Sequence, residues 1–212
     1  MRRSIIITIL ILNYLFLSGQ SLKRKSLTKA DKEHTVRWRY EYRSKEGFFG
    51  ESLLLFKSGR YKYEAGGCLQ GFFSEGRWAV VGNEMILNSD VKKNDVPVSV
   101  SYTNDTSDIV NAFKFGIVRN RKGDLMTDAF VIINNDSVKC LPMAGGCVGT
   151  YNRIDSVRLQ FENGFTSRWM GIANNDKHVL IRAEVDIKIE GYKSFDNVKY
   201  RLHGKLLIPD KQ

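Results

Sequence analysis

Apolar and polar residues alternate along much of this chain. The clearest example is VRWRYEYR at residues 36–43, in which Val36 and every second residue after it is apolar or aromatic. A period of two with β-branched and aromatic residues on one side is typical of a half-buried strand. The pattern therefore predicts a strand with one aromatic face and one charged face.

Paired apolar runs separated by turn residues follow this strand. ESLLLF meets YKYEA across Gly59, and RWAVV meets MILN across Gly82. Glycine adopts the positive backbone angles that tight turns need, so each pair is expected to form a hairpin. No segment of useful length has the helical period. We predict an antiparallel β-meander over residues 36–104, preceded by a polar basic lead at 21–35.

The second half repeats this pattern after a polar stretch at residues 88–111, and we place the domain boundary near residues 105–108. Turn-forming Asn, Asp and Gly residues separate its short apolar runs. Such runs within about 100 residues predict a β-sandwich, as in immunoglobulin-like folds, over residues 109–212. The fold class is all-β, and the runs are FKFGIV, AFVIIN, SVRLQF, SRWMGI, HVLIRAEV and VKYRLHGKLLI.

The first twenty residues have the order of a secretory signal peptide. Arg2 and Arg3 precede an apolar run from 5 to 17, and small or polar residues follow. The run is shorter than the roughly 20 residues of a spanning helix, although an uncleaved anchor is the alternative. We expect an exported protein, periplasmic, cell-surface or secreted, with no transmembrane segment after signal cleavage.

The formal net charge is +10, and the basic residues are scattered outside the lead. Nucleic-acid-binding proteins usually gather their charge on one face or helix, so this distribution and export both argue against that class. A soluble basic surface is the simplest interpretation. Attraction to an acidic polysaccharide or an anionic membrane surface is the sharper alternative.

The stretch CLPMAGGC places Cys140 and Cys147 at the ends of an eight-residue loop. In an oxidising compartment, the simplest interpretation is a disulfide between them, worth about 2–3 kcal/mol before strain. A redox centre usually has two intervening residues, and a metal site would need further ligands. The alternative pairing joins Cys68 to either cysteine; otherwise Cys68 is a free thiol.

The segment FGIVRNRKGDLMTDAFVIINNDSVKC resembles the carboxypeptidase regulatory-like (transthyretin-like) β-sandwich modules of exported bacterial proteins. The likeness covers roughly residues 113–183. It implies a module that stabilises, spaces or presents its neighbours and carries no catalytic residues. The first half, with its Gly-x-Trp at Gly76 to Trp78, looks like a module often found beside it, and more weakly like lipocalin meanders.

Candidate chemistry is sparse. His34, His178 and His203 lack the spacing of metal ligands, and no phosphate-binding loop, nucleophile elbow or calcium loop is present. We therefore predict no catalytic residue, metal or cofactor, and no enzymatic activity. Adjacent aromatic pairs and the basic face of the first strand are the candidate binding or interface residues, with internal packing and a solvated strand face as their alternatives: Phe48, Phe49, Phe72, Phe73, Arg37, Arg39 and Arg43.

These features favour a non-enzymatic interaction or scaffold protein of the bacterial cell envelope. Its partner would be another envelope protein or an anionic glycan. One alternative is a lipocalin-like carrier of an apolar or glycan ligand, which requires a closed barrel with an empty lumen. The other is a glycan-acting hydrolase, which requires two carboxylates converging in a cleft.

Overall fold

The computed structural model describes residues 20–67, 70–103, 118–126, 129–135, 139–140, 153–173, 178–184 and 189–210. The chain divides into two compact units, the first made of residues 1–90 and 193–212 and the second of residues 91–192. The second unit is therefore inserted in the sequence of the first. Each unit is described by itself.

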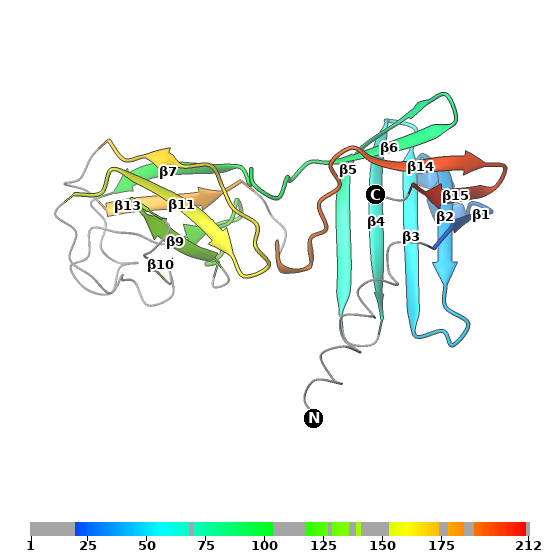
Figure 1. Ribbon diagram of the computed structural model, residues 1–212, viewed down its shortest axis with the longest axis horizontal. Coiled ribbons are helices and arrows are strands. Elements are labelled where there is room, and N and C mark those ends of the chain that lie inside the picture. Colours follow the sequence, from blue (N-terminus) through cyan, green and yellow to red (C-terminus); the bar gives the residue numbers. More distant parts are fainter. Residues whose placement is uncertain are drawn as a thin grey trace. The chain divides into compact units, whose positions relative to one another are not determined.

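The first unit is a closed antiparallel barrel of eight strands (Figure 1). Strands β2 to β6 form a meander, and the two C-terminal strands and β1 close it in the order β1-β15-β14-β6-β5-β4-β3-β2. The short helix α2 (Lys29–Glu33) connects β1 to β2. The strands are β1 (Leu22–Lys25), β2 (Val36–Arg43), β3 (Phe49–Phe56), β4 (Arg60–Gly67), β5 (Gly71–Val81), β6 (Glu84–Ser89), β14 (Val198–His203) and β15 (Leu206–Pro209).

The alternation of β2 explains how its residues enter this barrel. Val36 and Tyr40 are buried inside, and Trp38 and Tyr42 pack against the same core, so the predicted aromatic face is confirmed. Apolar side chains from all eight strands or their connections fill the centre. The most deeply buried of them, none more than 1% exposed, are Tyr40, Tyr61, Leu22, Leu53, Leu55, Met85, Leu87 and Leu207.

Strand β5 turns a corner of the barrel at Gly76. Its first residues pair with β4 and its last residues with β6, and Gly76 pairs with both neighbours. Figure 1 shows β6 and β14 crossing β3, β4 and β5 steeply. A Cβ on Gly76 would lie 2.0 Å from the carbonyl oxygen of Asn88, so only glycine fits this corner.

The described residues of the second unit form two small sheets. One has the order β10-β9-β11-β12 and the other β7-β13-β8, with a parallel pair between β8 and β13. Its buried side chains include Val131, Ile133, Val157 and Phe161. The elements are β7 (Val98–Thr103), β8 (Val118–Arg119), β9 (Ala129–Ile133), β10 (Lys139–Cys140), β11 (Ser156–Phe161), β12 (Met170–Gly171), β13 (His178–Ala183) and the 3-10 helix η2 (Ile189–Gly191).

The all-β prediction is confirmed for the described residues, whereas the strand arrangement differs from the prediction. VKYRLHGKLLI, assigned to a sandwich, forms β14 and β15 of a closed barrel. The lead at 21–35 supplies β1 and α2. Strand β1 belongs to the barrel because Leu22 pairs with Leu207 and is fully buried. The units therefore divide after residues 90 and 192, and the predicted boundary near 105–108 falls inside the second unit.

Candidate functional site

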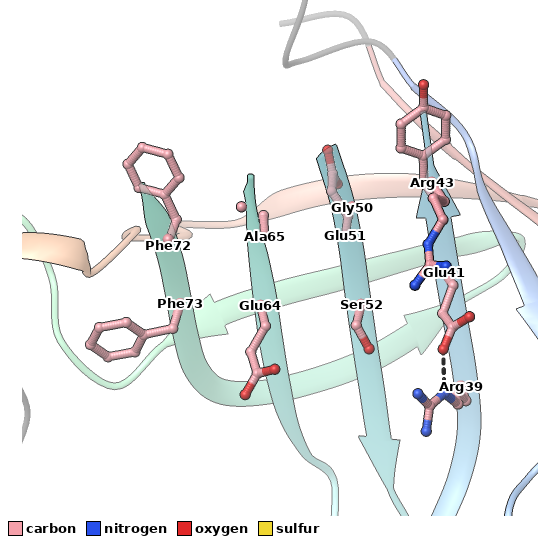
Figure 2. Close-up of a pocket in the computed structure, with 13 residues that line it drawn as sticks. Arg39, Glu41, Arg43, Gly50, Glu51, Ser52, Glu64, Ala65, Phe72 and Phe73 are labelled. Carbon is pink, nitrogen blue, oxygen red and sulfur yellow. Dashed lines mark hydrogen bonds and ion pairs between the residues drawn. The ribbon is translucent and has the colours of Figure 1, made fainter. Parts of the chain in front are cut away.

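A hollow of about 720 Å³ opens over one end of strands β2 to β5 (Figure 2). We call it the β2–β5 hollow. Every strand of this part of the sheet contributes to it, so its shape depends on the barrel register. The lining residues are Arg39, Glu41, Tyr42, Arg43, Gly50, Glu51, Ser52, Glu64, Ala65, Gly66, Gly71, Phe72 and Phe73.

Strand register places most of this lining on the outer face of the barrel. The buried row Tyr40, Leu53, Tyr63 and Ser74 faces the core, and the residues next to these on each strand face the opposite way. Two outer cross-strand rows result. The first is Glu41, Ser52, Glu64 and Phe73, and the second is Arg43, Gly50, Gly66 and Gly71.

Arg39 is fixed at one side of the hollow by two carboxylates. Its Nε donates to Glu41 Oε1 at 2.6 Å, and its terminal nitrogen donates to both oxygens of Asp31 at 3.2 Å. Asp31 also forms a capping box with Thr28 at the start of α2. Burial alone would raise the pKa of Asp31, but these hydrogen bonds outweigh it and lower the pKa. The charge of Arg39 is therefore already balanced.

Arg43 and Glu64 are the charged groups of the hollow that remain available to a ligand. Among the described residues, neither side chain has a hydrogen-bond or ion-pair partner. One donates hydrogen bonds only and the other, when ionised, accepts only. With the hydroxyl of Ser52 between their strands and the ring of Phe73 at the edge, the hollow offers both kinds of hydrogen bond beside an aromatic surface.

Three glycines form the floor of the hollow, and the fold explains one of them. A Cβ on Gly66 would lie 2.8 Å from the carbonyl oxygen of Gln70. At Gly50 the nearest atom would be the Tyr42 oxygen at an ordinary 3.5 Å, and at Gly71 nothing lies within 4 Å. Neither of these two has a positive φ. Glycine within a strand often marks close approach of a ligand or another backbone, and Gly50 and Gly71 fit that description.

The aromatic pairs divide between the two faces of the sheet. Phe49 and Phe72 pack against the barrel core, whereas Phe48 is 69% exposed and Phe73 lines the hollow from outside. Adjacent strand residues face opposite ways, so one member of each pair reaches the core, as expected. Of the basic candidates, Arg39 and Arg43 line the hollow, and Arg37 lies 4.8 Å from the ring centroid of Trp38 instead.

Nine residues that line the hollow were not among the predicted site residues. Those on the outer face are Glu41, Ser52, Glu64 and the three floor glycines. Glu41 could have been identified from the sequence, since it lies between Arg39 and Arg43 in the same alternation. Ser52 and Glu64 could not, because only the register of three strands brings them into the row of Glu41.

The inner side of the same strands holds a buried carboxylate. Glu51 is 9% exposed and accepts a hydrogen bond from Tyr63. Burial raises the pKa of Glu51, against the opposing effects of Lys193 and Tyr63. Lys193 is exposed along its chain, but its ammonium nitrogen lies 5.4 Å from the ring centroids of both Tyr63 and Phe195. This desolvation lowers the pKa of Lys193, against the attraction of Glu51.

Glu51 gives the barrel a pH dependence with a defined sign. Between the unfolded pKa of about 4.5 and the raised folded pKa, the folded state binds a proton that the unfolded state has lost, so stability falls as pH rises. We expect Glu51→Gln to remove this fall and to be more stable than wild type at pH 7. Urea unfolding from pH 4.5 to 8 measures it, and an unchanged pH slope in the variant would contradict the assignment.

The cysteine prediction lies almost wholly outside the described residues. Cys68 and Cys147 are not described, and for Cys140 only the backbone is, paired with Val131 in β10. The disulfide therefore stays a prediction. In the described part of the chain, no three His, Cys, Asp or Glu side chains are grouped as metal ligands. None of the helices described there is long and apolar enough to cross a membrane.

Comparisons with protein-family models, curated proteins and solved structures found no match to this chain. The resemblance of residues 113–183 to regulatory-like modules accordingly remains a prediction.

Proposed function

We propose that this protein is an exported, non-enzymatic binding protein of the cell envelope, and that its barrel binds a polysaccharide chain in the β2–β5 hollow. The observation that carries this proposal is the pair of outer rows. Glu64 lies beside Phe73 in one row, Arg43 lies at the β2 end of the glycine row, and neither charged side chain has a partner among the described residues.

The chemistry of the hollow suits a sugar. Sugar hydroxyls both donate and accept hydrogen bonds, so they can satisfy a guanidinium and a carboxylate together. The C–H face of a pyranose can pack on the ring of Phe73, since aromatic side chains combine a large apolar surface with a fixed shape. The open floor at Gly50 and Gly71 leaves room for a ring to approach the backbone. The hollow is open, as a binding surface for a long chain must be.

The filled barrel interior supports this site over the lumen of a lipocalin-like carrier. Tyr40, Tyr61 and Phe195 occupy the centre and are almost fully buried. A hydrolase is also less favoured. Glu41 and Glu64 share an outer row, but Glu64 is exposed and Glu41 is already bound by Arg39. For the second unit we propose a regulatory-like sandwich that spaces or presents the barrel.

Binding to an array of neutral and acidic oligosaccharides, followed by calorimetric titration of the best ligand, tests this function. We expect Gly71→Val to abolish binding, because a branched side chain would fill the floor. Phe73→Ala should weaken binding about tenfold, which corresponds to about 1.4 kcal/mol.

Gly171→Val in β12 is the matched control, because a Cβ there also meets nothing within 4 Å. It should bind like wild type. Equal affinity in all three variants would place the sugar elsewhere, and no binding of any oligosaccharide would contradict the proposed function. Cleavage of a bound oligosaccharide, lost in Glu64→Gln, would favour the hydrolase instead.

A further inference from the structure

A second surface of the barrel carries cations that have no acidic partner among the described residues. Arg24 and Arg37 lie 5.1 and 4.8 Å from the ring centroid of the same indole, Trp38, and Arg37 lies 5.8 Å from that of Trp78. The two indoles contact each other, with ring centroids 5.5 Å apart. Stacking on an aromatic ring fixes each guanidinium while leaving its hydrogen-bond donors free.

Two exposed lysines lie next to these groups along the backbone. The carbonyl of Lys205 accepts a hydrogen bond from the amide of Arg24 at 2.7 Å. Lys57 follows Phe56, whose carbonyl accepts a hydrogen bond from the indole nitrogen of Trp78 at 3.1 Å. Both lysines are exposed. Within the described residues, none of the four basic side chains pairs with a carboxylate, and the neighbouring Glu84 is bound by Lys199 at 2.9 Å.

Exposed aliphatic side chains border these cations. Strand β5 continues from Trp78 to Val80 and Val81 at the tip of the β5–β6 hairpin, where Val81 is 63% exposed. Val80 lies two residues beyond Trp78 and therefore on the same side of the strand. Together Arg24, Arg37, Lys57, Lys205, Trp38, Trp78, Val80 and Val81 form what we call the basic barrel end.

We propose that the basic barrel end binds an anionic lipid surface. The unpaired cations complement lipid phosphates, and each basic residue near an anionic membrane adds favourable energy. Tryptophan is enriched at the interface between headgroups and acyl chains, and the exposed valines supply apolar contact. A soluble acidic polysaccharide would use the cations and leave the valines in water, so the lipid surface accounts for more of these residues. This surface is distinct from the β2–β5 hollow and independent of its function.

Bromolipid quenching of tryptophan fluorescence in the full chain tests the proposal. Trp169→Phe removes the indole of the second unit, so the remaining emission comes from Trp38 and Trp78 alone. We expect vesicles of brominated phosphatidylglycerol to quench it, high salt to reverse the quenching, and vesicles of brominated phosphatidylcholine to have little effect. Insertion of residues 1–20 would also bring the barrel near the lipid, but it would not depend on Arg24 and Arg37, so the variants below separate the two effects.

In that background, Arg24→Gln with Arg37→Gln should reduce binding about thirtyfold, the effect expected for two lost basic residues. Val81→Asp should also reduce quenching. Lys45→Gln with Lys122→Gln is the matched control, since it removes two exposed cations from turns elsewhere and should leave quenching unchanged. Circular dichroism verifies folding of each variant.

Equal quenching by both lipids, or equal loss in the two double variants, would overturn the proposal. A third result would also overturn it: dextran sulfate shifts the indole emission, the shift requires Arg24 and Arg37, and vesicles cause no quenching. That result would identify an acidic polysaccharide as the partner.

Discussion

Replacing Gly76 with alanine should destabilise the barrel by at least about 3 kcal/mol, because the new Cβ would collide with backbone that cannot move alone. The Cβ would lie 2.0 Å from the Asn88 oxygen and 2.7 Å from the Ser89 Cα. Those atoms belong to β6, which is held between β5 and β14, so relieving the collision requires the corner of the barrel to open.

Urea unfolding followed by circular dichroism measures this effect. Gly171→Ala, at a position where a Cβ meets nothing, is the matched control and should change stability little. A Gly76→Ala barrel with wild-type stability would mean that β5 does not turn this corner as described.

Phe195→Ala should cost about 3–5 kcal/mol, the usual penalty for removing a buried aromatic ring. Phe195 is 2% exposed and contacts Tyr61 and Tyr63, with ring centroids 6.0 and 5.0 Å away. The amide nitrogen of Phe195 donates a hydrogen bond to the Ser89 hydroxyl at 2.6 Å. The carbonyl of Phe195 accepts one from the Ser89 amide at 2.7 Å. The ring therefore fills the barrel centre from a segment that follows the inserted unit.

Phe48→Ala provides the same chemical change at a side chain that is 69% exposed, and it should be close to neutral. The comparison also tests the insertion. A chain of residues 36–104 lacks β1, β14, β15 and Phe195, and it should not give the cooperative unfolding of the intact barrel. If Phe195→Ala were as mild as Phe48→Ala, the C-terminal segment would not be part of this core.

The buried hydroxyl cluster beside Phe195 favours a single arrangement of the strands around the barrel centre. Tyr61, Ser74 and Ser89 hydrogen-bond to one another at 2.9 to 3.0 Å, so each buried hydroxyl has partners. Satisfied polar groups in a core favour one arrangement of the surrounding strands. The strands that carry these three residues are the ones that meet at the Gly76 corner.

Sequence alternation alone predicted strands β2 to β6 of the barrel and which side chains of β2 face its core. Val36 to Tyr42 show the period of two. Because adjacent residues on a strand point apart, at most one member of each aromatic pair could be expected in the core, and only the structure identified Phe49 and Phe72 as those members. The turns at Gly59 and Gly82 were also predicted from the sequence, and both glycines have positive φ. Arg39 and Arg43 were identifiable as outward cations on the same grounds.

Only the tertiary structure decided how those strands join and what they bring together. Local patterning carries no information about which strand pairs with which across a hundred intervening residues, so β14 and β15 could not be assigned to the N-terminal barrel from sequence. The same reason hid the hollow, because Glu41, Ser52, Glu64 and Phe73 come from four strands and meet only through register. Pairing over long separations depends on burial of the whole core, and that is a property of the folded chain.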